Sequence, residues 1–534
     1  MSVRHILSSG TLVIACLGAT PAIAQQIPTS LLPDATVLAP RSMRVRVLSA
    51  FTRYDDLLGN GGTRNLGSLL ATDSLGPQQI PSFTVAQTDI RAASGLSNFR
   101  LTAGRVGALG NARVVTAPLI LEFGATSRLT LGVVVPLVET RVTMYSQLNS
   151  PPLIANVGPN PALADPTILT RNDALVQSMR RAATLLGDQL ASCQGNPTGQ
   201  GCATLLAQQS SAQTLIQTTG TVATALEDLY GTGATHPGQT YVPLSSNASQ
   251  QAINNRITTL GQQYQSLLNT NPISGSVTGA PAPGAQAAFQ ELLLASGRDT
   301  IGAVDRTSIG DISVGATYQL VNTYGDTTRT GQYRVAVNAA FRFGTGEPAN
   351  RNRVFDTSTG YGQPGVTVGG ATDIRFTRRV TLTALGSYTA QLGTIDVAHV
   401  ANAGNAIFPL TDAPGTYSAG NVLNLIVLPR YRLAGYFSVN GEYSLLHTGA
   451  DQYTVNAAVD QTAPTPPFGA DAATIQQLGI GFAYSTVSGA DRGPGRIPFE
   501  VSYNHLETIM ASGGPAPKTF RDQIEFRVYL GRRR

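Results

Sequence analysis

Hydrophobic and polar residues alternate with a period of two along much of the chain. In GDISVGATYQL, one face carries Ile312, Val314, Ala316, Tyr318 and Leu320. The stretches YRVAVNAAFRFG, VTLTALGSYTAQL, FSVNGEYSL, QLGIGFAYS and IPFEVSYN show the same pattern, as does the terminal RDQIEFRVYLGRRR. A strand places such residues on opposite faces, whereas a helix does not.

This pattern predicts twelve strands. They span 43–54, 113–126, 128–146, 308–323, 332–344, 366–376, 380–392, 423–432, 436–447, 475–486, 496–506 and 520–530. Most are about twice as long as the 5 or 6 residues that are usual in soluble proteins. A tilted strand that crosses a bilayer needs about 9 to 11 residues. The lengths therefore favour a membrane barrel over the alternative, a secreted soluble β-sandwich.

Short and long connections alternate between these strands. The short ones are 127, 324–331, 377–379, 433–435 and 487–495, and the long ones are 55–112, 147–307, 345–365, 393–422, 448–474 and 507–519. Outer-membrane barrels have short periplasmic turns and long outer loops. We therefore predict an all-β antiparallel transmembrane barrel with both termini periplasmic. Weak alternation in 83–90 and 98–106 leaves fourteen strands as an alternative to twelve.

The first residues resemble a secretory signal. Arg4 and His5 precede a short apolar run, and Ala22-Ile23-Ala24 forms a small-x-small cleavage site. We assign 1–24 to a signal peptide and 25–42 to a periplasmic N-terminal tail. A lipobox-like Val13-Ile14-Ala15-Cys16 leaves lipidation of Cys16 as an alternative. No later apolar run is long enough for a membrane helix.

Residues 147–307 follow a helical period instead. Apolar stripes run from Leu175 to Leu190, from Leu205 to Leu229 and from Ile253 to Leu267, and 285–296 is a fourth candidate helix. Cys193 and Cys202 flank a short loop, and export favours a disulfide between them. We expect an extracellular helical insert that stands outside the barrel or occludes its mouth. Strands one to three, with the long first loop, then occupy 43–146, and strands four to twelve occupy 308–530.

Alternation also predicts which charges face the barrel interior. They are Arg44, Arg46, Glu122, Glu139, Arg141, Asp311, Arg334, Arg342, Asp373, Arg375, Arg430, Arg432, Glu442, Glu500, Glu525 and Arg527. A charge facing lipid near the midplane would cost about 2 to 4 kcal/mol. Two interpretations stay open: these groups set the ion preference of a pore, or they form ion pairs that fill and stiffen the interior.

Composition narrows the function. Only 13% of residues are charged, 42% are hydrophobic, and the net charge is +5. This excludes a disordered chain, and the absence of a basic stripe argues against nucleic-acid binding. Because Trp is absent, an aromatic girdle must come from Tyr and Phe. The tyrosines near predicted strand ends are Tyr54, Tyr145, Tyr324, Tyr431, Tyr436 and Tyr484.

Catalytic motifs are missing. No P-loop, dinucleotide fingerprint, HExxH or CxxC occurs. His447 and His505 lie at outer strand ends, without a serine at an evidently complementary position, so we read them as surface residues. We predict no enzyme activity and no catalytic, cofactor or metal site.

The sequence resembles Gram-negative outer-membrane barrels, and within them the transporters grouped with meta-pathway phenol-degradation proteins, relatives of long-chain fatty-acid transporters. LTLGVVVPLVETRV at 129–142 and GDISVGATYQL at 310–320 carry the resemblance. It implies outer-membrane lipid, the barrel assembly machinery and a small hydrophobic or aromatic molecule as partners. The terminal strand departs from the family, because Gly531 and three arginines replace the usual terminal aromatic. The alternative is a non-transporting surface protein whose helical insert binds partners.

Overall fold

The structure is a computed structural model that divides into two compact units. It describes residues 31, 33–59, 62–78, 80, 83–148, 154–282, 290, 294, 301–324, 331–349, 356–397, 415–455, 471–487 and 497–531. Unit 1 comprises Met1–Leu70, Ala108–Tyr145 and Arg298–Arg534, and unit 2 comprises Ala71–Gly107 and Ser146–Gly297.

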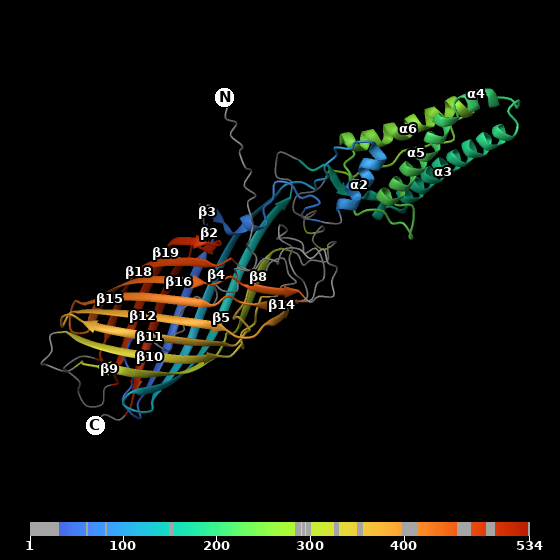
Figure 1. The fold of residues 1–534 in the computed structure, drawn as a ribbon. Coiled ribbons are helices and arrows are strands. Elements are labelled where there is room, and N and C mark those ends of the chain that lie inside the picture. Colours follow the sequence, from blue (N-terminus) through green and yellow to red (C-terminus); the bar gives the residue numbers. More distant parts are fainter. Residues whose placement is uncertain are drawn as a thin grey trace, which may run out of the picture. The chain divides into compact units, whose positions relative to one another are not determined.

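Unit 1 is a closed antiparallel barrel of twelve strands (Figure 1). In ring order the strands are β1 (Met43–Tyr54), β21 (Phe520–Leu530), β19 (Phe499–Gly513), β18 (Ala473–Ser485), β16 (Phe437–Thr448), β15 (Val422–Arg432), β12 (Val380–Gln391), β11 (Gly365–Arg375), β10 (Gln332–Arg342), β9 (Ser313–Asn322), β5 (Leu129–Leu148) and β4 (Val106–Gly124). The first strand closes the ring by pairing with the last, from Met43↔Leu530 to Arg53↔Phe520. The predicted twelve-stranded architecture is confirmed.

One predicted strand is interrupted. The sequence predicts one continuous strand over 308–323, but two strands occupy this region. β8 (Ala303–Ile309) pairs with residues 137–143 of β5, and β9 pairs with residues 129–134 of β5. Asp311 is buried in the break, where its carboxylate accepts hydrogen bonds from the backbone N–H groups of Gly346 and Tyr361. The backbone donors of the break are satisfied separately, because the Gly310 N–H donates to the Pro136 carbonyl and the Ile312 N–H donates to the Thr345 hydroxyl.

The fourteen-stranded alternative is wrong. Residues 83–90 belong to helix α2 (Phe83–Ser94), which buries Phe83, Ala86, Ile90 and Ala93 at helical spacing. Five of the barrel strands are longer than predicted, most of all β4, which begins at Val106, and β19, which continues to Gly513; β5, β15 and β18 are each one residue longer.

Small sheets and one short helix build the loops of unit 1. β2 (Asp56–Gly59), β3 (Gly62–Asn65) and β20 (Ala516–Pro517) form one sheet, and β13 (Ile395–Val397), β14 (Gly415–Ser418) and β17 (Gln452–Val455) form another. The 3-10 helix η1 spans Leu66–Leu69. Both sheets lie at the end we call the long-loop end. The opposite, short-turn end carries the turns 125–128, 376–379 and 433–436.

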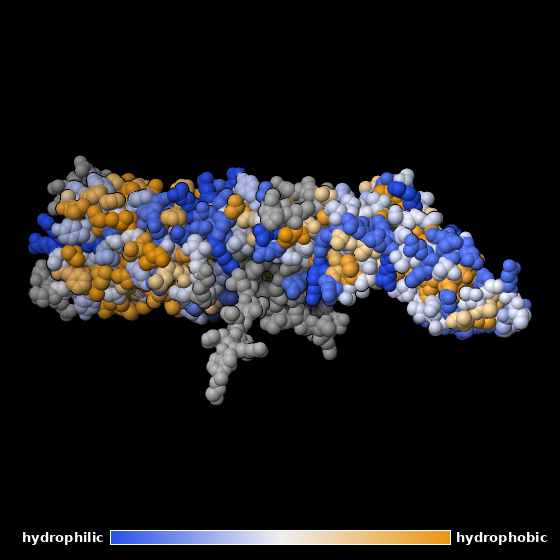
Figure 2. Space-filling view, turned by 90° about the horizontal axis from the view of Figure 1, so that it is seen from above, coloured by the Kyte–Doolittle hydropathy of each residue, from blue (hydrophilic) through white to orange (hydrophobic). Residues whose placement is uncertain are grey.

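An apolar belt covers the outside of the barrel. Its side chains are a third to two thirds exposed, and include Val47, Leu119, Leu131, Val337, Val368, Leu425, Ile480 and Ile524. Figure 2 shows hydrophobic side chains spread over the surface of the barrel. Aromatic pairs follow its short-turn margin, among them Tyr436 with Tyr484, Phe437 with Phe482 and Phe499 with Phe526. Tyr54 and Tyr324 do not join a girdle, because Tyr54 is buried and Tyr324 lies inside against two arginines.

Unit 2 is helical (Figure 1). It contains α2, α3 (Pro166–Gly195), α4 (Cys202–Ala207), α5 (Gln209–Tyr230), α6 (Ala248–Leu268), the short helix η2 (Pro161–Leu163) and the strand pair β6 (Val157–Pro159) and β7 (Tyr241–Pro243). The three predicted stripes are buried in α3, α4 with α5, and α6. The fourth, 285–296, lies mostly outside the described residues. Within the described part of the chain, helices that combine the length and apolarity needed to cross a bilayer do not occur.

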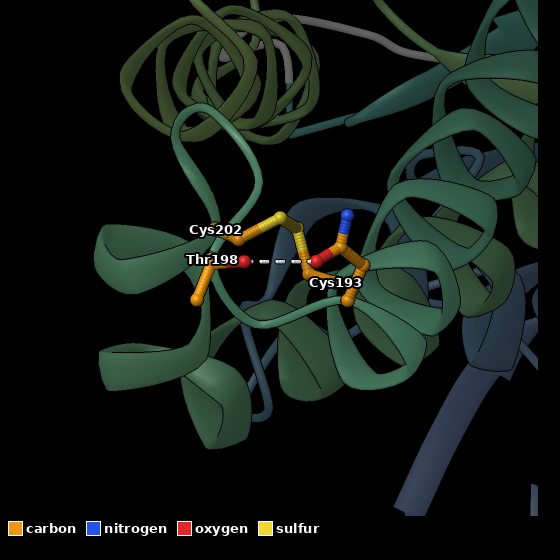
Figure 3. The surroundings of a disulfide bond; sticks show 4 residues. Cys193, Thr198 and Cys202 are labelled. Atoms are coloured by element: carbon orange, nitrogen blue, oxygen red, sulfur yellow. Dashed lines mark hydrogen bonds between the residues drawn. A yellow bond between two sulfur atoms is a disulfide. The ribbon is translucent and has the colours of Figure 1, made fainter.

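A disulfide joins Cys193 at the end of α3 to Cys202 at the start of α4, the pair expected from the sequence (Figure 3). Inside the loop it closes, the Thr198 hydroxyl donates to the Asn196 amide oxygen at 3.0 Å. The cross-link therefore fixes the corner between α3 and the α4–α5 arm.

Asp89 on α2 gives unit 2 a pH-dependent stability. Burial, and then the nearby Asp228 carboxylate on α5, raise the pKa of Asp89 to about 6. Its Oδ2 atom is buried without a hydrogen-bond partner. Because the folded state holds the proton more tightly than the unfolded state, stability falls as pH rises from the ordinary value of 3.8 through about 6.

We expect Asp89→Asn to stabilise unit 2 above pH 6 by on the order of 1 kcal/mol, after allowance for solvent screening of a partly exposed group. The gain should vanish near pH 4, where the wild-type carboxyl is already neutral. Thermal loss of helical circular dichroism at the two pH values measures it. Equal effects at both pH values would contradict the assignment.

Candidate functional site

Most of the predicted interior charges do lie on the interior face of the barrel. The exceptions are Glu139 and Arg141. On β5 the interior phase is held by Val134, Val138 and Val142, all at most 2% exposed. The side chains of Glu139 and Arg141 point outward, on the same face of β5 as Leu137. They lie beyond Leu137, in the part of the strand that extends past the apolar belt. A charge there meets water rather than hydrocarbon, so the outward phase carries no penalty.

Arg44 and Glu122 form a two-pronged ion pair between β1 and β4. The Arg44 Nε and Nη2 atoms lie 2.5 and 2.7 Å from the two carboxylate oxygens of Glu122. The side chains are only 1% and 2% exposed. Such parallel bonds are strong in a low-dielectric interior.

A larger charged cluster spans the seam where the barrel closes. Glu525 on β21 lies 2.7 Å from both Arg46 on β1 and Arg527 on β21. Arg527 also lies 3.4 Å from Glu500 on β19 and 3.4 Å from Asp34. Three neighbouring strands and the N-terminal segment are thus joined by alternating charges.

The N-terminal segment, described at 31 and 33–42, belongs to the stretch 25–42 that the sequence assigns to a periplasmic tail, and its described residues lie inside the barrel. Leu31 packs against Ile120 and Val134, and Ala35 packs against Ala336 and Ala371. Polar contacts hold the same stretch. They are Ala35 N–H to Asp373 at 3.2 Å, Gln319 Nε2 to the Ala35 carbonyl at 2.9 Å and Leu38 N–H to the Thr130 hydroxyl at 2.9 Å.

Asp373 is the interior group that organises this contact. Its carboxylate accepts from Arg334 at 2.7 Å and from the Thr383 hydroxyl at 2.7 Å, besides the Ala35 N–H. The segment therefore rests on strands β10 and β11, while Asp34 reaches Arg527 on β21. It crosses the interior from wall to wall.

The β10–β11 loop occupies the interior at the long-loop end. Its residues 356–359 and Gln363 are at most 5% exposed. The Thr357 hydroxyl lies 2.8 Å from that of Thr140 on β5, and Arg306 donates to Asp356 at 3.0 Å. Arg342 stacks on Tyr361, with its guanidinium 4.4 Å from the ring centre, and lies 3.6 Å from Asp311.

A cavity of about 260 Å³ lies within the barrel, with Pro33 and Asp34 of the N-terminal segment in its wall. The strands contribute mostly polar and charged residues. They include Arg46, Asn338, Asp373, Arg375, Arg430, Arg432, Asn440, Glu442, Glu525 and Arg527. Acids and bases both reach it, and most of them are already paired as described above.

Three arginines of the cavity have no carboxylate partner among the described residues. Arg375 donates to the Gln332 amide oxygen at 2.9 Å, and with Arg334 it lies about 4 Å from the Tyr324 ring centre. Arg430 and Arg432 lie on β15 at the short-turn side of the cavity. Excess positive charge is thus concentrated on the β11–β15 wall.

The two candidate histidines lie on the outward phase. His447 Nδ1 lies 2.9 Å from the Thr474 hydroxyl. The His505 ring lies 2.8 Å from the Asp522 carboxylate and 3.1 Å from the Glu507 carboxylate. The Tyr503 hydroxyl donates a hydrogen bond to the same Asp522 carboxylate. Within the part of the chain that the structure describes, the side-chain partner of His447 is a threonine hydroxyl and those of His505 are carboxylates.

The closed ring, the apolar belt and the alternation of turns and loops are the architecture of a Gram-negative outer-membrane barrel. No protein-family model and no curated protein matches the chain. Among solved structures it is similar to an outer-membrane channel from Pseudomonas putida F1, at 10% identity and a TM-score of 0.40 over 93% of this chain and 98% of that one. It is also similar to the Ralstonia pickettii toluene transporter TbuX, at 10% identity and a TM-score of 0.27 over 97% and 95% of the two chains. A Pseudomonas aeruginosa FadL homologue gives 10% identity and a TM-score of 0.25 over 97% and 95%.

The Arg44–Glu122 pair gives a sharp stability test. We expect Glu122→Gln to destabilise the barrel by about 3 to 5 kcal/mol, because it leaves the buried Arg44 charge uncompensated. The double variant Arg44→Met/Glu122→Leu removes both charges and should be close to neutral. Urea unfolding in detergent, followed by the gel mobility of unboiled samples, compares the two. A double variant as unstable as Glu122→Gln would refute this account.

Proposed function

We propose that this protein is an outer-membrane channel for small molecules, with the N-terminal segment as its internal barrier. The observation that carries the proposal is the cavity. The described side chains do not fill the interior of the twelve-stranded barrel, and part of the wall of the remaining cavity is the N-terminal segment.

The proposed orientation follows from the connections. Short turns suit the periplasmic side and long loops the outside. The chain termini would then be periplasmic and the helical unit extracellular, after removal of a signal peptide ending at 24.

The contacts of the segment are compatible with displacement. Besides the apolar packing of Leu31 and Ala35, three hydrogen bonds and one ion pair are the polar contacts that hold Asp34, Ala35 and Leu38. Such bonds contribute about 0.5 to 3 kcal/mol each. The polar contacts together lie within reach of the binding free energy of a small ligand, so a molecule that entered the cavity could replace these hydrogen bonds.

The cavity wall favours planar molecules. Arg334 and Arg375 flank the Tyr324 ring, and guanidinium groups stack on aromatic faces. This supports the aromatic substrate class that the sequence resemblance implies. The free arginines add a preference for molecules that carry negative charge.

A second candidate function rests on unit 2. That unit has its own buried helical core and disulfide, as a binding module would. Deletion of 150–305 separates the two functions: a channel keeps its permeability, whereas a surface-binding protein loses partner binding.

We expect a tethered N-terminal segment to close the channel. Ala35 and Ala336 pack together, so Ala35→Cys/Ala336→Cys offers a cross-link from the segment to β10. In planar bilayers the oxidised variant should be closed, and a reductant should restore wild-type conductance. Each single cysteine variant, under the same reductant, controls for the native disulfide. Equal conductance in oxidised and reduced protein would exclude the segment as the barrier.

We also expect the unpaired arginines to set ion preference. Arg430→Gln/Arg432→Gln should lower the anion-to-cation permeability ratio by about twofold or more, because positive charge is removed from the cavity wall. Reversal potentials in a salt gradient measure the ratio. Arg378→Gln/Arg379→Gln in the exposed turn 376–379 is the matched control and should change it less. Equal shifts in both variants would contradict a role for the cavity.

A further inference from the structure

Three arginines form a row on the outer surface of the barrel. Arg53 on β1 is the direct cross-strand partner of Arg113 on β4. Two contacts give the register between the antiparallel strands β4 and β5: Glu122 lies beside Gly132, and Gly110 lies beside Met144. Continuing this register places Arg141 on β5 opposite Arg113 on β4. All three side chains are exposed and on the outward phase.

The row lies at the edge of the apolar belt. On β4 the outward side chains from Phe123 to Val115 are apolar, and Arg113 comes next. Between Phe123 and Arg113 the strand rises about 33 Å at ~3.3 Å per residue. A tilt of about 40° reduces this to about 25 Å along the membrane normal, the usual height of the apolar band. The arginines therefore stand at the membrane–water boundary of the long-loop end.

The barrel compensates this row only in part: Asp305 on β8 lies directly opposite Arg141, whereas Arg53 has Phe520 and Arg113 as its cross-strand partners. Like charges placed directly opposite on neighbouring strands are destabilising. The nearby carboxylates are Glu139 on β5, Asp305, which is paired in register with Arg141, and Asp522, which is bonded to His505 and Tyr503. Among the described residues, none of these acids forms an ion pair with the row, and the Arg53 guanidinium lies over the Phe520 ring at 5.8 Å.

We propose that this row binds the phosphate groups of a phosphorylated glycolipid, the lipid A part of lipopolysaccharide, in the outer leaflet. Guanidinium groups bind phosphate oxygens through paired N–H donors and remain charged at any physiological pH. Strands about 4.8 Å apart spread the three groups over about 10 Å, which suits one or two phosphates. Bound phosphate would also remove the repulsion between Arg53 and Arg113.

The test uses the full-length protein in detergent with three probes: bisphosphorylated lipid A, the same lipid enzymatically dephosphorylated, and inorganic phosphate. Native mass spectrometry counts bound lipid. We expect wild type to retain bisphosphorylated lipid A and not its dephosphorylated form. Arg53→Gln/Arg113→Gln/Arg141→Gln should bind at least about tenfold more weakly, and Arg378→Gln/Arg379→Gln at the opposite end should bind as wild type does.

Several outcomes would overturn the proposal. They are undiminished binding by the triple glutamine variant, equal binding of dephosphorylated lipid, and displacement of the lipid by millimolar inorganic phosphate. Gel mobility of unboiled samples checks folding, and the triple lysine variant, which keeps the charge, should recover part of the binding. Channel conductance is measured separately, so loss of lipid binding and failure of the proposed transport are distinguishable.

Discussion

The pairing of the first strand with the last is the constraint on which this structure depends. In hydrocarbon, every backbone N–H and C=O must find a partner within the protein, so a ring of strands must close completely. β1 meets β21 over its whole length, and the charged cluster of Arg46, Glu525 and Arg527 lies across the same seam. Ion pairs therefore stabilise the β1–β21 pairing, where an open strand edge would leave backbone groups unpaired in hydrocarbon.

The interior shows how one set of charges can serve two purposes. Arg44 with Glu122, and Arg334 with Asp373, are paired at hydrogen-bond distance and fill space. Arg430 and Arg432 have no such partner in the described part of the chain and face the cavity instead. Paired charges therefore occur both at the β1–β21 seam and on β10 and β11, whereas the arginines without a carboxylate partner among the described residues lie on β11 and β15.

Much of the barrel was predictable because the period-two pattern is local. It identified the strands, the terminal pairing strand and most interior residues. It did not show where the membrane ends along a long strand, so Glu139 and Arg141 were assigned to the wrong face. Nor did it separate the weak pattern at 83–90 from a helix, because burial of Phe83 and Ile90 depends on partners far away in the sequence.

The position of the N-terminal segment was beyond the reach of pattern reasoning. Residues 31–42 have no periodicity, and the contact between Ala35 and Asp373 joins groups 338 positions apart. The one local indication is Asp34, an isolated acid in a largely apolar stretch, because a buried carboxylate needs a basic or hydrogen-bonding partner. Contacts of this kind are determined by the shape of the closed ring, which no short window of sequence contains.

The enclosed segment also constrains the order of events during biogenesis. Asp34 bonds to Arg527 on the final strand, while the residues that follow it lead directly into the first strand. Two orders of events are compatible with this arrangement. In the first, the barrel closes around the segment; in the second, the segment enters the closed barrel past the arginines at the short-turn end. The first route brings the Asp34 carboxylate and the Arg527 guanidinium together as the ring closes, so the ion pair between them forms in the same step as the last strand pairing.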